Sequence, residues 1–140
     1  MAKDASTSAQ GDLVLSNLTK SFGDFVAVDN LNLTIPQGKF FALLGPSGCG
    51  KTTALRVVAG LESPTSGEVR VKGKVINNLP ASLRDMGMVF QSYSLFPNMT
   101  VSANIAYGLR VRNYSAEKRN KRVKKMIELV SLGDKVDKYP

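Results

Sequence analysis

Apolar residues recur with a period of two in the first part of the chain and with a helical period towards its end. Every second residue of Leu31–Ile35 is apolar, which predicts a strand with one buried face. Val101, Ile105 and Leu109 share one face of a predicted helix, and Thr100 is a suitable N-cap for it. The element order, with antiparallel strands, a strand–loop–helix unit and then mostly helix, predicts an α/β fold.

Short apolar segments predict further strands, and clusters of Gly, Pro, Ser and Asp predict the turns between them. We expect turns at Ser21–Asp24, Pro36–Gly38 and Ser63–Gly67. We expect strands at Leu13–Leu15, Phe25–Val28, Phe40–Leu44 and Met88–Phe90, and a hairpin of Val69, Val71, Val75 and Ile76 around Gly73. Because every residue of Phe40–Leu44 is apolar, that strand is expected to be buried on both faces.

The 140 residues are 43% hydrophobic, which suits one globular domain with a core. No apolar run approaches the roughly 20 residues of a membrane-spanning helix. Residues Met1–Asp12 are small and polar and are expected to form a disordered lead-in to a domain that covers Leu13–Pro140. Cys49 is the only cysteine, so the chain has no internal disulfide, and we interpret it as a tolerated small residue in a reducing compartment.

The segment Gly45–Thr52 fits the phosphate-binding pattern Gly-x-x-x-x-Gly-Lys-Thr. A helical stretch, Thr52–Ala59, follows it, and Gly60 stands where a helix stop belongs. Glycines let successive backbone N–H groups converge on phosphate oxygens, and the positive end of the helix adds to the attraction. In such a loop Lys51 reaches the β- and γ-phosphates, and the hydroxyl of Thr52 ligates Mg²⁺. The pattern predicts a site for a nucleoside triphosphate and Mg²⁺.

Net charge is +8, and a basic cluster lies at Lys118–Lys125. This cluster is open to two interpretations, a nucleic-acid patch or the solvated face of an amphipathic helix. The second is favoured because Val123, Met126, Ile127 and Val130 recur at helical spacing after a potential N-cap, Ser115. No aromatic residue interrupts Glu117–Leu132, so a stacking platform for single strands is disfavoured.

Several motifs in order resemble the ATP-binding subunit of ABC transporters. They are Leu44–Thr53 with Leu55 and Ala59–Leu61, then Ser66–Val69 with Gly73, and then Val89–Gln91, which resembles the Q-loop of that family. The segments Leu95–Val101, Asn104–Ile105 and Tyr107–Leu109 resemble the importer branch that serves polyamines, sugars, iron or phosphonates. That branch often has His at the position of Asn98 and Ala at that of Ser94. The resemblance implies a nucleotide-binding region at 13–91 and the start of a helical subdomain at 92–140.

The resemblance also implies a role for each matching residue. Phe22 would stack on adenine, although a hairpin anchor is the alternative role for its ring. Gln91 would ligate Mg²⁺ and sense the γ-phosphate, because its carbonyl oxygen is a hard ligand and its NH₂ group donates. Lys51 and Gln91 are the expected catalytic residues, and Thr52 and Gln91 the expected metal ligands. The residues expected to cradle ATP are Phe22, Gly45, Pro46, Ser47, Gly48, Cys49, Gly50, Lys51, Thr52 and Thr53.

As an importer ATPase the protein would act as a dimer on the cytoplasmic face of the membrane, and Ser92–Arg112 would face the permease. The family's Leu-Ser-Gly-Gly-Gln signature, its Asp-Glu strand and its switch histidine do not occur in these residues. The chain is therefore expected to be the N-terminal part of such an ATPase and to hydrolyse ATP poorly alone. Two alternatives remain, a soluble ABC ATPase acting on nucleic acid or the ribosome, and a small P-loop kinase or GTPase.

Overall fold

A computed structural model describes residues 12–140, so the expected disordered lead-in falls almost wholly outside the described residues. The chain divides into two compact units, the first ending at Met88 and the second covering Val89–Pro140. The expected functional boundary after Gln91 stays a prediction. Each unit is described by itself below.

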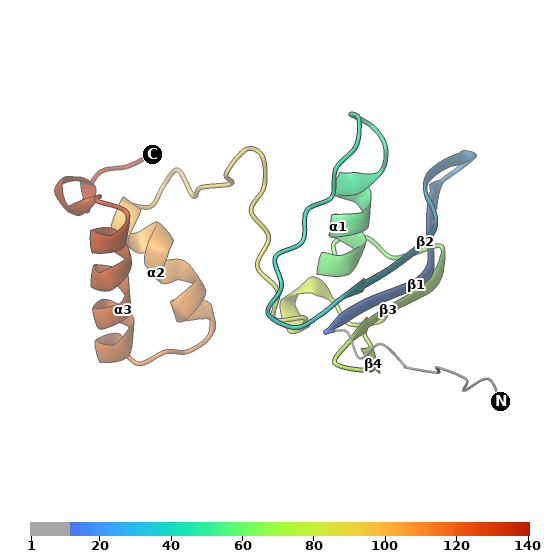
Figure 1. Ribbon diagram of the computed structural model, residues 1–140. Helices are drawn as coiled ribbons and strands as arrows, with labels where there is room; N and C mark the ends of the chain where they lie inside the picture. The colour runs from blue at the N-terminus through green and yellow to red at the C-terminus, as the bar shows by residue number, and fades with distance from the viewer. Residues whose placement is uncertain (1–11) are drawn as a thin grey trace. The chain divides into compact units, whose positions relative to one another are not determined.

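The first unit contains a four-stranded antiparallel sheet with the order β2-β1-β3-β4 (Figure 1). The strands are β1 (Leu13–Phe22), β2 (Phe25–Ile35), β3 (Ser66–Val71) and β4 (Lys74–Val75). Leu15 on the central strand β1 pairs with Leu33 on one side and with Val69 on the other. The expected turn after Phe22 and the expected hairpin around Gly73 are confirmed.

The two strands expected at Phe25–Val28 and Leu31–Ile35 are one continuous strand, β2. The polar residues between them are accommodated by irregular pairing with β1, where Asn17 and Asn30 have φ values of 49° and 43°. Asn tolerates this left-handed conformation better than most residues. The side chain of Asn32 accepts a hydrogen bond from the backbone N–H of Asn17 at 2.9 Å, which restores a partner at the irregularity.

Helix α1 (Lys51–Ala59) contributes to the core of the first unit. The side chains of Leu18, Val57 and Val69 are fully buried, and they come from β1, α1 and β3. The expected helix after the glycine-rich loop is confirmed and begins one residue earlier than expected, at Lys51. Gly60 ends it with φ of 78°, which confirms the expected stop.

The prediction of a strand is wrong for two segments. Neither Phe40–Leu44 nor Met88–Phe90 is in a strand, and the side chains of Phe40 and Leu44 are 96% and 91% exposed. All strands among the described residues belong to the one antiparallel sheet, and neither segment pairs with any of them. An apolar run supplies the tendency to be buried, but a strand also needs hydrogen-bond partners.

The second unit pairs helix α2 (Val101–Val111) with helix α3 (Ala116–Leu129). Thr100 caps α2 as expected, and its hydroxyl oxygen accepts from the N–H of Ala103 at 3.2 Å. Ser115 precedes α3 as expected, but its side chain makes no capping hydrogen bond. The small core contains Ala106, Val123 and Ile127. Met126 and Val130, expected on the buried face, are 36% and 55% exposed.

The segment after α3 returns to the start of α2. It contains a short 3₁₀ helix, Gly133–Lys135. The carbonyl oxygens of Lys138 and Val136 accept from the first N–H groups of α2, those of Val101 and Ser102, at 2.8 and 3.1 Å. Two donors that a helix N-terminus leaves without partners are satisfied in this way. Within residues 12–140 no helix combines the length and apolar character needed to cross a membrane.

Candidate nucleotide-binding site

The loop Gly45–Gly50 enters α1 in a conformation that depends on its glycines. Gly48 and Gly50 have φ values of 81° and 86°, in the left-handed region that side chains disfavour. A Cβ atom at Gly50 would overlap the carbonyl oxygen of Ala27 on β2, so backbone packs against backbone there. A Cβ atom at Gly45 would lie 2.8 Å from the Sγ of Cys49. The second strand and the loop therefore leave no room for side chains at the points where the pattern places glycine.

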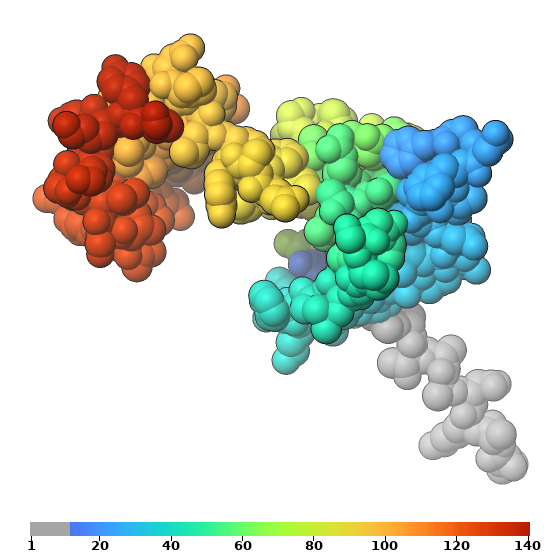
Figure 2. All heavy atoms as spheres, turned by 90° about the horizontal axis from the view of Figure 1, so that it is seen from above, coloured from blue at the N-terminus to red at the C-terminus, as the bar shows by residue number. Residues whose placement is uncertain are grey.

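The N-terminus of α1 is open to an anion. Its N-cap is Gly50, which has no side chain to cap the helix, and its first turn contains no acidic residue. The first N–H groups of a helix lack partners within the helix and carry partial positive charge. The segment that contains the loop lies at the surface of the first unit (Figure 2), and Pro46, Ser47, Gly48 and Cys49 are exposed. This arrangement suits a phosphate group.

The side chain of Lys51 is folded back over the loop. Its Nζ atom donates to the carbonyl oxygens of Gly45 and Pro46 at 2.8 and 2.6 Å, and it lies 3.3 Å from the Sγ of Cys49. An ammonium group has three donors, and these three contacts use all of them. The thiol is the weakest acceptor of the three, so the Cys49 contact is the one that a phosphate oxygen can replace at least cost.

A cavity of about 230 Å³ lies beside the loop. It is lined by β2 residues, by Leu43 and Leu44, and by Cys49, Gly50 and Lys51. The side chain of Thr52 is exposed and that of Thr53 is half-buried, both in the first turn of α1. The structure thus brings the expected phosphate-binding residues together, and their roles in binding stay predictions.

Phe22 lies in the same unit, at the end of β1 where the hairpin turns. Phe22 is 47% exposed, and the Nζ of Lys20 lies over its ring at 4.7 Å from the ring centroid. Sequence reasoning gave Lys20 no role. No motif indicates it, because its polar partners, Glu62 and Ser63, lie more than 40 residues away along the chain.

Arg84 was also missed as a support of α1. Its buried guanidinium donates to the carbonyl oxygens of Val57 and Val58 at 2.9 Å each, and to those of Leu79 and Asn77 at 2.7 and 3.0 Å. Cationic donors at a helix C-terminus satisfy the last carbonyl groups and oppose the helix dipole. Burial lowers the pKa of the Arg84 guanidinium from its ordinary value.

Gln91 is an exposed residue in a turn of the second unit. Its expected part in ligating Mg²⁺ stays a prediction, as does that of Thr52. Among residues 12–140 no group of three or more His, Cys, Asp and Glu side chains is placed to hold a metal ion. A site with few protein ligands is still the usual case for Mg²⁺, which keeps most of its coordination for water and phosphate.

The region expected to face a permease, Ser92–Arg112, comprises an irregular segment and α2. The side chain of Asn104 accepts from the N–H of Phe96 at 2.9 Å and donates to the carbonyl oxygens of Phe96, Met99 and Thr100. The rings of Phe96 and Tyr107 are 4.4 Å apart. One amide on the helix therefore fixes the irregular segment that precedes it.

Comparison with known proteins gives consistent matches. The family model described as ABC transporter matches residues 28–140. An "Fe(3+) ions import ATP-binding protein" of Pasteurella multocida is 53% identical over 91% of this chain and 36% of its own length. A "Spermidine/putrescine import ATP-binding protein" of Thermobifida fusca is 54% identical over 81% of this chain and 30% of its own length.

A solved structure, a dimeric post-hydrolysis state of the ATP-binding cassette MJ0796 bound to ADP and phosphate, matches with a TM-score of 0.80 at 32% identity. The match covers 91% of this chain and 61% of the cassette. The described residues therefore have the fold of the corresponding part of an ABC cassette, and the chain spans about a third of the length of the curated relatives. This chain belongs to the ABC transporter family.

Proposed function

We propose that this chain is the ATP-binding part of an ATPase subunit that drives solute import. Two features support the proposal. The loop Gly45–Thr52 has the conformation of a phosphate cradle at an open helix N-terminus. The relatives described above are named as import ATP-binding proteins. The transported solute is not proposed, because iron and polyamine relatives match at nearly the same identity.

The residues present fit ATP with Mg²⁺. The loop follows a backbone path that its glycines permit, with open space beside the Cα atom of Gly48, and Lys51 supplies the cation for the β- and γ-phosphates. The hydroxyl of Thr52, in the first turn of α1, would hold Mg²⁺. The amide oxygen of Gln91, in the second unit, stays a predicted ligand on the family resemblance alone. When bound, Mg²⁺ neutralises charge that develops on the phosphate oxygens. Phe22 would stack on the adenine ring.

The proposed partners are a second copy of the subunit and an integral membrane permease. The dimeric cassette structure supports the first, and the importer relatives support the second. Ser92–Arg112 is the proposed permease contact, since it exposes Tyr93 and Leu95 at 78% and 58%. The protein would then lie peripherally on the cytoplasmic face of the membrane. We propose no specific nucleic-acid partner.

The conformation of the phosphate-binding loop carries the proposal, and Lys51 tests it. Lys51→Ala removes the one side-chain cation of the loop, so we expect binding of MgATP to weaken by more than about tenfold, the scale of a charged hydrogen bond. Calorimetry on the folded chain measures the dissociation constant. Lys74→Ala is the matched control, because Lys74 lies exposed on β4. Equal affinities for the parent chain and Lys51→Ala would refute the proposal.

A further inference from the structure

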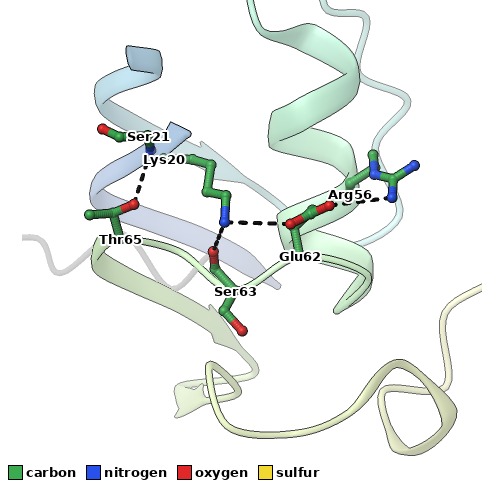
Figure 3. Close-up of polar contacts among 6 residues, drawn as sticks. All are labelled: Lys20, Ser21, Arg56, Glu62, Ser63 and Thr65. Atoms are coloured by element: carbon green, nitrogen blue, oxygen red, sulfur yellow. Dashed lines mark hydrogen bonds and ion pairs between the residues drawn. The ribbon is translucent and has the colours of Figure 1, made fainter. Parts of the chain in front are cut away.

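Lys20 is a nearly enclosed cation on β1. Its side chain is only 14% exposed. The Nζ atom donates to the carbonyl oxygen of Ser63 at 2.9 Å and lies 3.4 Å from a carboxylate oxygen of Glu62 (Figure 3). A lysine ammonium is usually left in water, since holding it fixed costs side-chain entropy and hydration. Two charged or polar partners together with the ring of Phe22 make this position an exception.

The ammonium group and the Phe22 ring are neighbours for a geometric reason. Residues 20 and 22 are separated by two positions on a strand, so their side chains project from the same face. The Nζ atom lies over the ring at 4.7 Å from its centroid, within the range of a cation–π interaction. One face of the ring is therefore in contact with Lys20, and Phe22 as a whole residue is still 47% exposed.

The same cation is connected to α1. The carboxylate of Glu62 joins Lys20 to Arg56 in the last turn of α1, at 3.4 and 3.3 Å (Figure 3). The N–H group of Glu62 also donates to the carbonyl oxygen of Arg56 at 3.3 Å. Thr65 pairs this segment with β1, because its hydroxyl oxygen accepts from the N–H of Ser21 at 2.9 Å. The location of the ammonium is thus fixed from both β1 and the C-terminal end of α1.

We propose that Lys20 is a positioning residue that holds the Phe22 ring for stacking on the nucleotide base. The ammonium occupies one face of the ring and leaves the other face for the base. The bridge through Glu62 keeps that ring in a fixed relation to α1, the helix that begins with the phosphate-binding Lys51. This inference rests on the proposed ATP binding and goes further by naming a residue that determines how well the base is bound.

The test separates base binding from phosphate binding. Dissociation constants of MgATP and of magnesium tripolyphosphate are measured by calorimetry for the full chain, for Lys20→Met and for Lys20→Arg. Met retains the length and apolar stem of Lys without its charge, and Arg retains a cation over the ring. We expect Lys20→Met to weaken ATP binding about threefold, the scale of a cation–π contact on a partly exposed ring. We expect it to leave tripolyphosphate binding unchanged, and Lys20→Arg to bind ATP like the parent chain.

Lys74→Met is the control for loss of one positive charge, and both ligands should bind to it as to the parent chain. If Lys20→Met binds ATP unchanged, or loses affinity for both ligands equally, Lys20 does not position the base. If the parent chain binds neither ligand, the proposed function fails and the role of Lys20 fails with it. A parent chain that binds both ligands therefore distinguishes failure of this inference from failure of the proposed function.

Discussion

Helices α1 and α3 differ in a way that separates positive charge from the phosphate recognition proposed for α1. The longer helix, α3, carries Lys118, Arg119, Lys121, Arg122, Lys124 and Lys125, and all of these except the half-buried Arg119 are exposed. The shorter, α1, has two cations, Lys51 and Arg56. Yet α3 has the acidic residue Glu117 in its first turn, whereas α1 has none and follows a glycine loop. A phosphate site needs backbone N–H groups that converge at a helix end, and the number of nearby cations does not supply that.

The largest expected effect concerns the support of α1. Arg84→Met removes a donor from each of four carbonyl oxygens, including those of Val57 and Val58 at the end of α1. The Val57 carbonyl keeps the N–H of Gly60 as a donor. Since each of the other three carbonyls loses this partner at a cost of about 1 kcal/mol or more, we expect the free energy of unfolding to fall by about 3 kcal/mol. Amide hydrogen exchange should accelerate more in α1 than in α3.

The control for this change is Arg110→Met, because Arg110 is exposed at the end of α2. Its effect on the free energy of unfolding should stay below about 0.5 kcal/mol. A loss of less than 1 kcal/mol in Arg84→Met would show that α1 does not depend on this cation.

A second comparison concerns how tightly each helix is packed. Val57 on α1 is fully buried in the larger core, whereas Val123 on α3 lines a cavity of about 340 Å³ between α2 and α3. Deleting methyl groups costs less where packing is already incomplete. We expect Val57→Ala to lower the free energy of unfolding by about 2 kcal/mol and Val123→Ala by about half of that. Denaturant unfolding of both variants measures this, and equal losses would remove the distinction.

The sequence correctly predicted the helix starts and ends that are determined by residues a few positions away. The glycine pattern predicted α1 and its end at Gly60, and Thr100 predicted the start of α2, because caps and turns involve residues a few positions apart. The apolar run Phe40–Leu44 predicted a strand, and that prediction was wrong. Whether a run forms a strand depends on a neighbouring strand, and its own composition does not contain that information.

The same limit applies to the site. The glycines and Lys51 were predicted because one continuous segment specifies their geometry. Arg84 was not, since its partners are backbone carbonyls, which every residue carries. Lys20 was not, since Glu62 and Ser63 lie more than 40 residues away along the chain. Phe22 was predicted to stack on adenine because of the resemblance to ABC transporter ATPases. The structure adds that the Nζ of Lys20 lies over its ring.

A smaller effect is expected at Phe22, and it tests whether recognition extends from the loop to the base. Phe22→Ala removes the stacking surface, so we expect ATP binding to weaken by about 1 kcal/mol, which is about fivefold. Phe22→Tyr retains the ring and should bind ATP like the parent chain. Calorimetry with ATP measures both. Unchanged binding in a folded Phe22→Ala chain would confine recognition to the phosphates.

The smallest effect is expected on α3, where charge is present without a cradle. The triple variant Lys118→Gln, Lys121→Gln and Lys125→Gln removes three exposed cations and leaves the buried Val123 and Ile127 in place. We expect its ATP affinity to equal that of the parent chain.

Association with nucleic acid through these lysines should be independent of sequence and lost at moderate salt, because it depends on released counterions alone. Fluorescence anisotropy with labelled single strands and duplexes, at about 0.05 and 0.2 M salt, measures this. Tight, sequence-selective binding by the parent chain at the higher salt, lost in the triple variant, would make α3 a recognition surface. It would also favour an ABC ATPase that acts on nucleic acid over an importer. Loss of ATP affinity in the triple variant would contradict the contrast between the two helices directly, since phosphate recognition would then depend on diffuse charge as well as on the loop.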